Sequence, residues 1–220
     1  MLTSEAAALP RTAYAVALAD FARRHGLGRG DVVRAYHAVR AMPYRSGSDR
    51  TPLTALRRGR GACTARHVIL RDLLRLQGAT ADVELVEGDF AAGFFATPAM
   101  PDALAAMVRE GGVPDVHCHV RVGRGSDTRR LDATWPDAMR SLGVRVNDAW
   151  DGVGDTIGAM PGGVIRSAPE DVLGQKARLL SKLTHSQSER RTTFLRLLSS
   201  WLDGLERDTR GRMIDGAEDG

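Results

Sequence analysis

One stretch constrains the fold of this chain more than any other, a glycine-flanked loop that leads directly into a helix. The loop is Arg60–Gly61–Ala62, and Cys63 follows it. After Cys63, apolar side chains recur at the spacing of one helix face, and Gly78 stands where a glycine commonly ends a helix. We therefore predict a central helix that begins at or beside Cys63 and ends at Gly78. Its predicted buried face consists of Val68, Ile69, Asp72, Leu73 and Leu76.

The predicted position of Cys63 gives its thiol a chemical use. The first turn of a helix holds unpaired backbone N–H groups and the positive end of the helix dipole. Both favour the thiolate, which is the nucleophilic form of cysteine, and the same N–H groups can bind an oxyanion. The alternative is that Cys63 is a small buried apolar residue, as most free cysteines are.

Two downstream segments carry the groups that a cysteine nucleophile needs, a base and a residue that orients the base. Residues 116–122 read Val-His-Cys-His-Val-Arg-Val, and residues 129–134 contain Leu-Asp-Ala-Thr. Both segments predict strands, which together form a hairpin. His117 and His119 share one face of the first strand, and Asp132 of the second strand is in a position to meet a histidine.

The register of this hairpin depends on its turn. If Gly125–Ser126 are the central turn residues, His119 lies opposite Asp132 and His117 is the diagonal neighbour. If Arg124–Gly125 are the central residues instead, His117 itself faces Asp132. The polar and glycine residues between the strands permit several turns, so periodicity leaves both registers open.

These three pieces, in this order, resemble the transglutaminase-like cysteine superfamily: Cys63 at a helix start, a histidine in His-x-x-Val-x-Val, and an aspartate in Leu-Asp-x-Thr. The resemblance covers residues 51–136. It implies a papain-like core in which Cys63 is the nucleophile, His117 the general base and acid, and Asp132 the orienting residue. Members of the superfamily form or break amides through a thioester, although some have lost the triad and serve structurally.

The resemblance also selects between the two histidines. The His-x-x-Val-x-Val pattern falls on His117, with Val120 and Val122 at the matching positions. We therefore expect His117 rather than His119 to be the base.

The expected fold is α+β, with a papain-like or transglutaminase-like core. In it the central helix with Cys63 packs on an antiparallel sheet, and further helices lie at both ends of the chain. We expect a single transglutaminase-like domain over residues 1–207. It would comprise N-terminal helices in 1–50, the core in 51–136 and a C-terminal extension in 137–207. Residues 208–220 are charged and glycine-rich and predict a disordered tail.

The composition of the chain indicates its expected cellular compartment and its expected classes of partner. The chain has 220 residues, of which 43% are hydrophobic and 26% charged, as in an ordinary soluble protein. With no segment long enough to span a membrane and no secretory signal, we expect a cytoplasmic protein without a membrane partner. In that reducing compartment Cys63 and Cys118 would stay free thiols. The net charge is +4, but aromatic residues do not interleave with the arginines, so we expect no nucleic-acid partner.

The expected function is cysteine-dependent acyl transfer through a thioester, which either forms or hydrolyses an amide. The substrate would be a small molecule, a peptide or a carrier-bound acyl group, and no cofactor is expected. Candidate substrate contacts are His119, Phe94, Phe95 and Trp135. For the three aromatic residues, the alternative is that they pack in the core.

Other functions are compatible with the same residues. Cys63, His67, His117 and His119 could together hold a metal ion such as zinc. A non-catalytic binding module on a degenerate transglutaminase-like fold is a further alternative. An arylamine acetyltransferase-like enzyme also uses Cys, His and Asp, but Arg60–Gly61–Ala62–Cys63 matches its cysteine motif only in part. A leucine-rich stripe within 194–205 predicts a core or partner-facing helix, so the chain is expected to be a monomer or a homodimer.

Overall fold

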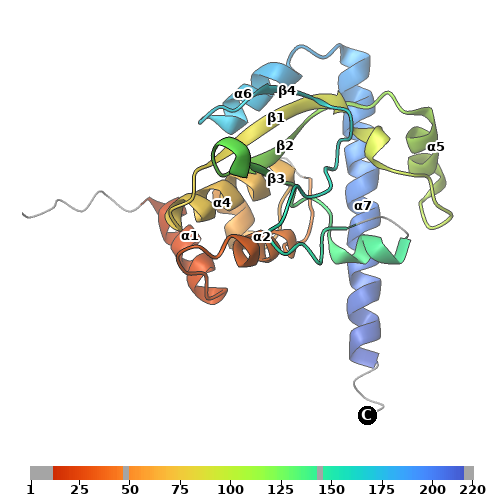
Figure 1. Cartoon of the computed structure of the whole chain (residues 1–220). Coiled ribbons are helices and arrows are strands. Elements are labelled where there is room, and N and C mark those ends of the chain that lie inside the picture. Colours follow the sequence, from red (N-terminus) through yellow and green to blue (C-terminus); the bar gives the residue numbers. More distant parts are fainter. Residues whose placement is uncertain (1–11, 47–49, 143–145, 216–220) are drawn as a thin grey trace, which may run out of the picture.

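The computed structural model describes residues 12–46, 50–142 and 146–215, and its architecture is α+β. Helices cover an antiparallel sheet, and the longest helix runs along one side of the molecule (Figure 1). The α-helices are α1 (Ala13–Arg24), α2 (Val32–Arg40), α3 (Pro52–Arg58), α4 (Cys63–Leu76), α5 (Asp102–Glu110), α6 (Val172–Leu180) and α7 (His185–Asp215). The strands are β1 (Ala81–Asp89), β2 (Pro114–Val122), β3 (Arg129–Leu131) and β4 (Val164–Ser167).

The central element is α4, which begins at Cys63 as predicted. It packs against the sheet on one side and against α2 and α3 on others, so it is buried over most of its circumference. The prediction that Leu76 lies in the buried face was wrong, because Leu76 is 65% exposed. The Asp72 carboxylate likewise lies at the edge of the packed region, where it accepts a hydrogen bond from the Tyr14 hydroxyl. Leu70 and Leu74 fill the buried positions in their place, each contributing roughly 2 kcal/mol.

The sheet has the strand order β3-β2-β1-β4, and all of its pairings are antiparallel. β1 and β2 pair along their full lengths, and most of their apolar residues point to the face that α4 covers, whereas Val86 lies opposite His117 on the other face. The predicted strands at 82–87 and 116–122 are confirmed, whereas β4 was not predicted. β4 is short and partly exposed, so it lacks the apolar alternation that marks the other strands.

The hairpin register follows from the pairing of Val120 with Leu131. This is the register predicted for a turn centred on Gly125–Ser126, although the connection contains a 3-10 turn over Gly125–Asp127. β3 ends at Leu131, three residues earlier than predicted. Asp132 therefore lies just beyond the ladder, and the chain after it leaves the sheet and forms hydrogen bonds with Arg66 and His67 of α4.

The C-terminal part of the chain completes the core. Residues on one face of α7 are fully or almost fully buried, which confirms the core interpretation of the leucine-rich stripe; they are Phe194, Leu195, Leu198, Trp201 and Leu202. α7 continues to Asp215, beyond the predicted start of a tail at 208, and its far end projects away from the sheet (Figure 1). Within the part of the chain that the structure describes, no helix is long and apolar enough to cross a membrane.

Arg66 fixes the position of α4 relative to two neighbouring segments. Its guanidinium is fully buried and donates to the backbone carbonyls of Val39 and Arg40 at the end of α2. It also donates to the carbonyl of Thr134 in the segment that follows β3. Burial lowers the pKa of Arg66 to about 10, so it remains charged at neutral pH. One side chain thus donates to three buried carbonyls, of which that of Val39 also accepts from the N–H of Met42.

We predict that Arg66→Met lowers the free energy of unfolding by roughly 3 kcal/mol, because three buried carbonyls lose a charged donor. Urea denaturation followed by circular dichroism measures this loss. Arg57→Met is the matched control, since Arg57 is exposed on α3 and should change stability by less than about 0.5 kcal/mol. Equal stability of the two variants would contradict the role given to Arg66.

Candidate active site

The structure brings His117 of β2 and Asp132 together in the protein interior. His117 Nε2 lies 2.8 Å from Asp132 Oδ2, and both side chains are buried. The hairpin register places His119 opposite Asp132, yet the carboxylate reaches diagonally to His117 instead. Since the carboxylate can only accept, His117 donates through Nε2–H. Among the residues that the structure describes, none makes a hydrogen bond with its Nδ1, so this is the nitrogen at which the ring can take up or release a proton.

Backbone N–H groups hold the Asp132 carboxylate in this orientation. Oδ1 accepts from the N–H of Thr134 at 3.0 Å, and Oδ2 accepts from the N–H of Ala159 at 2.7 Å. Thr156 Oγ1 in turn accepts from the N–H of Asp132. Burial disfavours the charged carboxylate, but the charge and hydrogen bond of His117 outweigh it, so the pKa of Asp132 lies well below its usual range. The segment that contains Thr156 and Ala159 is therefore part of the site.

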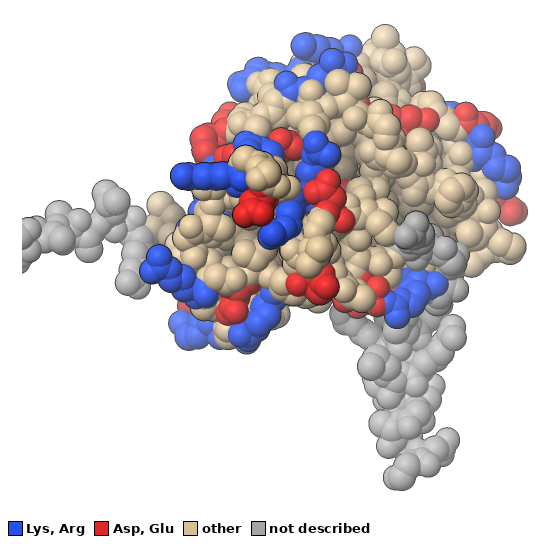
Figure 2. Space-filling model, in the orientation of Figure 1, with Lys and Arg blue, Asp and Glu red and all other residues tan. Residues whose placement is uncertain are grey.

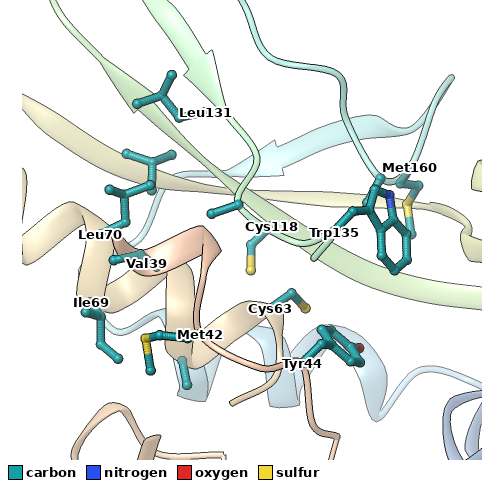
Figure 3. Packing of buried hydrophobic residues seen from close by; sticks show 14 of the residues in the cluster. Val39, Met42, Tyr44, Cys63, Ile69, Leu70, Cys118, Leu131, Trp135 and Met160 are labelled. Atoms are coloured by element: carbon teal, nitrogen blue, oxygen red, sulfur yellow. The ribbon is translucent and has the colours of Figure 1, made fainter. Parts of the chain in front are cut away.

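Cys63 lies at the first position of α4, directly after the N-cap residue Ala62. Its side chain is only 4% exposed and lies below Cys118 of β2 in the close view (Figure 3). The loop before it is fixed by a close approach: a Cβ on Gly61 would lie 2.9 Å from the Cβ of Ala55. Glycine at 61 thus lets the loop pack on α3 while Cys63 enters the core.

The surroundings of Cys63 favour its thiolate. A hydrogen bond from the Cys118 thiol lowers the pKa of Cys63, burial opposes this, and the positive charges of Lys176 and His117 lower it further. The pKa of Cys63 consequently lies well below that of an ordinary thiol. Burial alone would lower the pKa of His117, but Asp132 and Cys63 outweigh burial and raise it to about 10. The two shifts reinforce each other, because the thiolate and the imidazolium each stabilise the charged form of the other.

His67 has a structural role one turn further along α4. Nδ1–H donates to the carbonyl of Cys63 at 2.8 Å, and Nε2 accepts from the N–H of Ala133 at the same distance. This pattern requires the neutral imidazole, in agreement with a pKa that burial lowers. Both ring nitrogens of His67 are therefore occupied by backbone groups.

The four residues predicted as an alternative metal site are not arranged as one. His67 has no free nitrogen, and His119 Nε2 pairs with Glu84 at 2.7 Å. Within residues 12–46, 50–142 and 146–215, no group of three or more His, Cys, Asp or Glu side chains is placed to hold a metal ion.

His119 belongs instead to an open cleft on the face of the sheet opposite α4. The cleft has a volume of about 430 Å³, and His117, His119, Arg130 and Asp132 are among the residues that line it. It therefore gives access to His117 and Asp132, whereas Cys63 is not among its lining residues. Acidic and basic side chains are interspersed on the molecular face that Figure 2 shows, so this face carries no large patch of a single charge.

The three aromatic candidates for substrate contacts differ in position. Phe94 and Trp135 are buried and pack edge to face, with ring centroids 4.7 Å apart. Phe90, which was not predicted, stacks on both Trp135 and His117 and so fixes the imidazole plane. Phe95 is 85% exposed and points away from this cluster. The geometry thus favours core packing for Phe94 and Trp135 and gives Phe95 no contact with the triad.

Sequence patterns missed Lys176 of α6, which is 5% exposed and lies beside Cys63. Its Nζ is 3.0 Å from Thr64 Oγ1 and 3.8 Å from Cys63 Sγ. The only signal in the sequence was the rarity of lysine, since Lys176 and Lys182 are the sole lysines of the chain. That rarity does not indicate which of the two is buried.

In comparisons with known proteins, the chain matches no family model, no curated protein and no solved structure. The function is therefore inferred from the geometry of the site.

His117→Ala and His119→Ala are a matched pair that tests the assignment of the base. We expect His117→Ala to slow alkylation of Cys63 by iodoacetamide near neutral pH by about tenfold or more, because loss of the imidazolium raises the pKa of the thiol and so lowers its thiolate fraction. The rate should recover as the pH is raised through the new thiol pKa. His119→Ala should alkylate like the wild type. The opposite behaviour of the two variants would make His119 the base.

Proposed function

We propose that the protein is a cysteine-dependent acyl-transfer enzyme of the transglutaminase-like type. One observation carries the proposal: Asp132 holds the buried His117 imidazole through Nε2, and the same ring interacts with Cys63 at a helix N-terminus. This is the arrangement that activates a nucleophile through a base and an orienting group. A cysteine-bearing helix packed on an antiparallel sheet also supports the expected papain-like core.

In the proposed reaction, the Cys63 thiolate attacks an acyl carbonyl and forms a tetrahedral intermediate. The proton that His117 holds passes to the leaving group as the intermediate collapses to a thioester. His117 Nδ1 then accepts a proton from the second nucleophile, which is water in hydrolysis or an amine in amide formation. Asp132 keeps the imidazole oriented and stabilises its charged form throughout.

Burial of the thiol sets a condition on this reaction. With Cys63 only 4% exposed, an acyl group reaches it only when neighbouring side chains move aside. Tyr44 belongs to the segment that bridges to Gly61, next to the nucleophile loop, and its hydroxyl is buried there. A small acyl group or an extended acyl chain fits this constraint better than a bulky, branched one.

The same burial favours a second candidate, a non-catalytic binding module. In that case the cleft lined by His119 and Arg130 would bind a polar ligand, and Cys63 would serve packing alone. The two candidates differ in whether Cys63 ever becomes acylated.

We predict that p-nitrophenyl acetate or a simple acetyl thioester acylates Cys63, detected as an acetyl adduct by intact-protein mass spectrometry and peptide mapping. Cys118 provides the internal comparison and should stay unmodified, since it is fully buried and its pKa is raised by burial. Added hydroxylamine should yield the hydroxamate if the enzyme accepts amines. An unmodified Cys63 under all donors would leave the non-catalytic module as the better candidate.

Substitutions extend the same test. Cys63→Ser should abolish acylation by these donors while leaving the fold intact, because the hydroxyl is nearly isosteric but a far poorer nucleophile. Asp132→Asn should retain part of the rate, since an orienting group is less demanding than the nucleophile. Full turnover in Cys63→Ser, with any donor, would remove covalent catalysis by this residue.

A further inference from the structure

Lys176 is an unusual neighbour for a nucleophile, because its amine is buried and no carboxylate of the described residues makes a hydrogen bond with it. Nζ donates to Thr64 Oγ1 at 3.0 Å, and its other contact is Cys63 Sγ at 3.8 Å. Thr64 follows Cys63 on α4, so one helix turn presents both partners to an amine that comes from α6. The contact thus joins elements that are distant in the sequence.

A buried ammonium costs several kcal/mol unless an anion lies nearby. The charged and titratable groups that face Lys176 are Cys63, Asp115, Cys118 and Arg191. Asp115 already accepts from Arg191 Nε at 2.7 Å, and both of those side chains are buried. Cys118 stays protonated, because burial and Cys63 raise its pKa. The anion that balances Lys176 is therefore the Cys63 thiolate.

That balance changes during the proposed reaction. When the thiolate attacks, its electron pair forms the new S–C bond and the carbonyl π pair moves to oxygen as an oxyanion. The oxyanion forms on the carbon bonded to Sγ, within reach of a donor 3.8 Å from Sγ. On collapse the carbonyl re-forms, the leaving group departs with the proton from His117, and Lys176 neither gains nor loses a proton.

We propose that Lys176 is a catalytic residue, whose ammonium first pairs with the Cys63 thiolate and then donates a hydrogen bond to the oxyanion of the tetrahedral intermediate. This role rests on the proposed acyl transfer. Preorganised donors at a developing oxyanion are among the largest contributions to catalysis. Thr64 Oγ1 holds the ammonium in place for both tasks.

The charge pair is measured without any substrate. Because the chain has two lysines, lysine-selective ¹⁵N labelling gives an assignable NMR titration of each amine, with exposed Lys182 as the internal reference. In Cys63→Ser the amine of Lys176 should lose its proton at a lower pH than in the wild type, while the signal of Lys182 should not differ between the two proteins. An unchanged Lys176 titration would overturn the pairing.

The oxyanion role is separated from the thiolate role by two reagents. Iodoacetamide alkylation creates no oxyanion, whereas acylation by p-nitrophenyl acetate does. Near neutral pH, Lys176→Met should slow alkylation about tenfold or more, because the thiolate fraction falls. At a pH where Cys63 is fully ionised in both proteins, alkylation should recover and acylation should stay about a hundredfold slower. Lys182→Met should resemble the wild type in both reactions.

Recovery of both reactions at high pH would overturn the oxyanion role, and unchanged neutral-pH alkylation would overturn the pairing. Circular dichroism of Lys176→Met checks that the fold is kept, and the NMR titration decides the pairing if it is not. If the wild type alkylates rapidly but is never acylated, the proposed function fails and the oxyanion role fails with it. That result is distinct from a defect confined to Lys176→Met.

Discussion

Balanced charge around the first turn of α4 is the constraint on which the rest of the structure depends. Ionised groups are costly to bury, and three pairs of opposite charges from different elements offset that cost here, while carbonyls satisfy the buried Arg66 guanidinium. The pairs are Cys63 with Lys176, His117 with Asp132, and Asp115 with Arg191. They connect α4 to α6, β2 to the segment after β3, and β2 to α7. Removing one member would leave its partner buried and uncompensated, so the docking of these elements and the ionisation of the site are linked.

This linkage means that the site is not confined to residues 51–136, the region of the family resemblance. The Asp132 carboxylate needs the N–H of Ala159, and the Cys63 thiolate needs Lys176, and both come from the C-terminal part of the chain. The predicted C-terminal extension thus contributes residues to the candidate site. The open cleft is lined by His117 and Asp132 but not by Cys63. Core side chains bury Cys63, so a reagent reaches the thiol only when neighbouring side chains move.

Local signals in the sequence predicted the elements that carry Cys63 and His117 and the segment that carries Asp132. Gly61 and Gly78 bracket α4, and alternation along 116–122 identified β2 together with the face of each histidine. The contact between His117 and Asp132 was not fixed by pairing, because the register alone puts His119 opposite the carboxylate. Backbone N–H groups from elsewhere in the fold decide which histidine it reaches. Lys176 escaped prediction for a similar reason, since a single lysine on an ordinary amphipathic helix has no local pattern that marks it as buried.

The most direct test of a preformed thiolate is the ultraviolet absorbance of the thiolate ion, titrated with pH in the wild type and in Cys63→Ser. The difference between the two curves reports Cys63 without requiring any reagent to enter the core. Cys118 remains protonated over the same range, because burial raises its pKa. We expect the difference signal to be fully developed at neutral pH and to disappear only on acidification, well below the pKa of about 8.5 of an ordinary thiol. A difference signal that develops only above that value would contradict the ion-paired site.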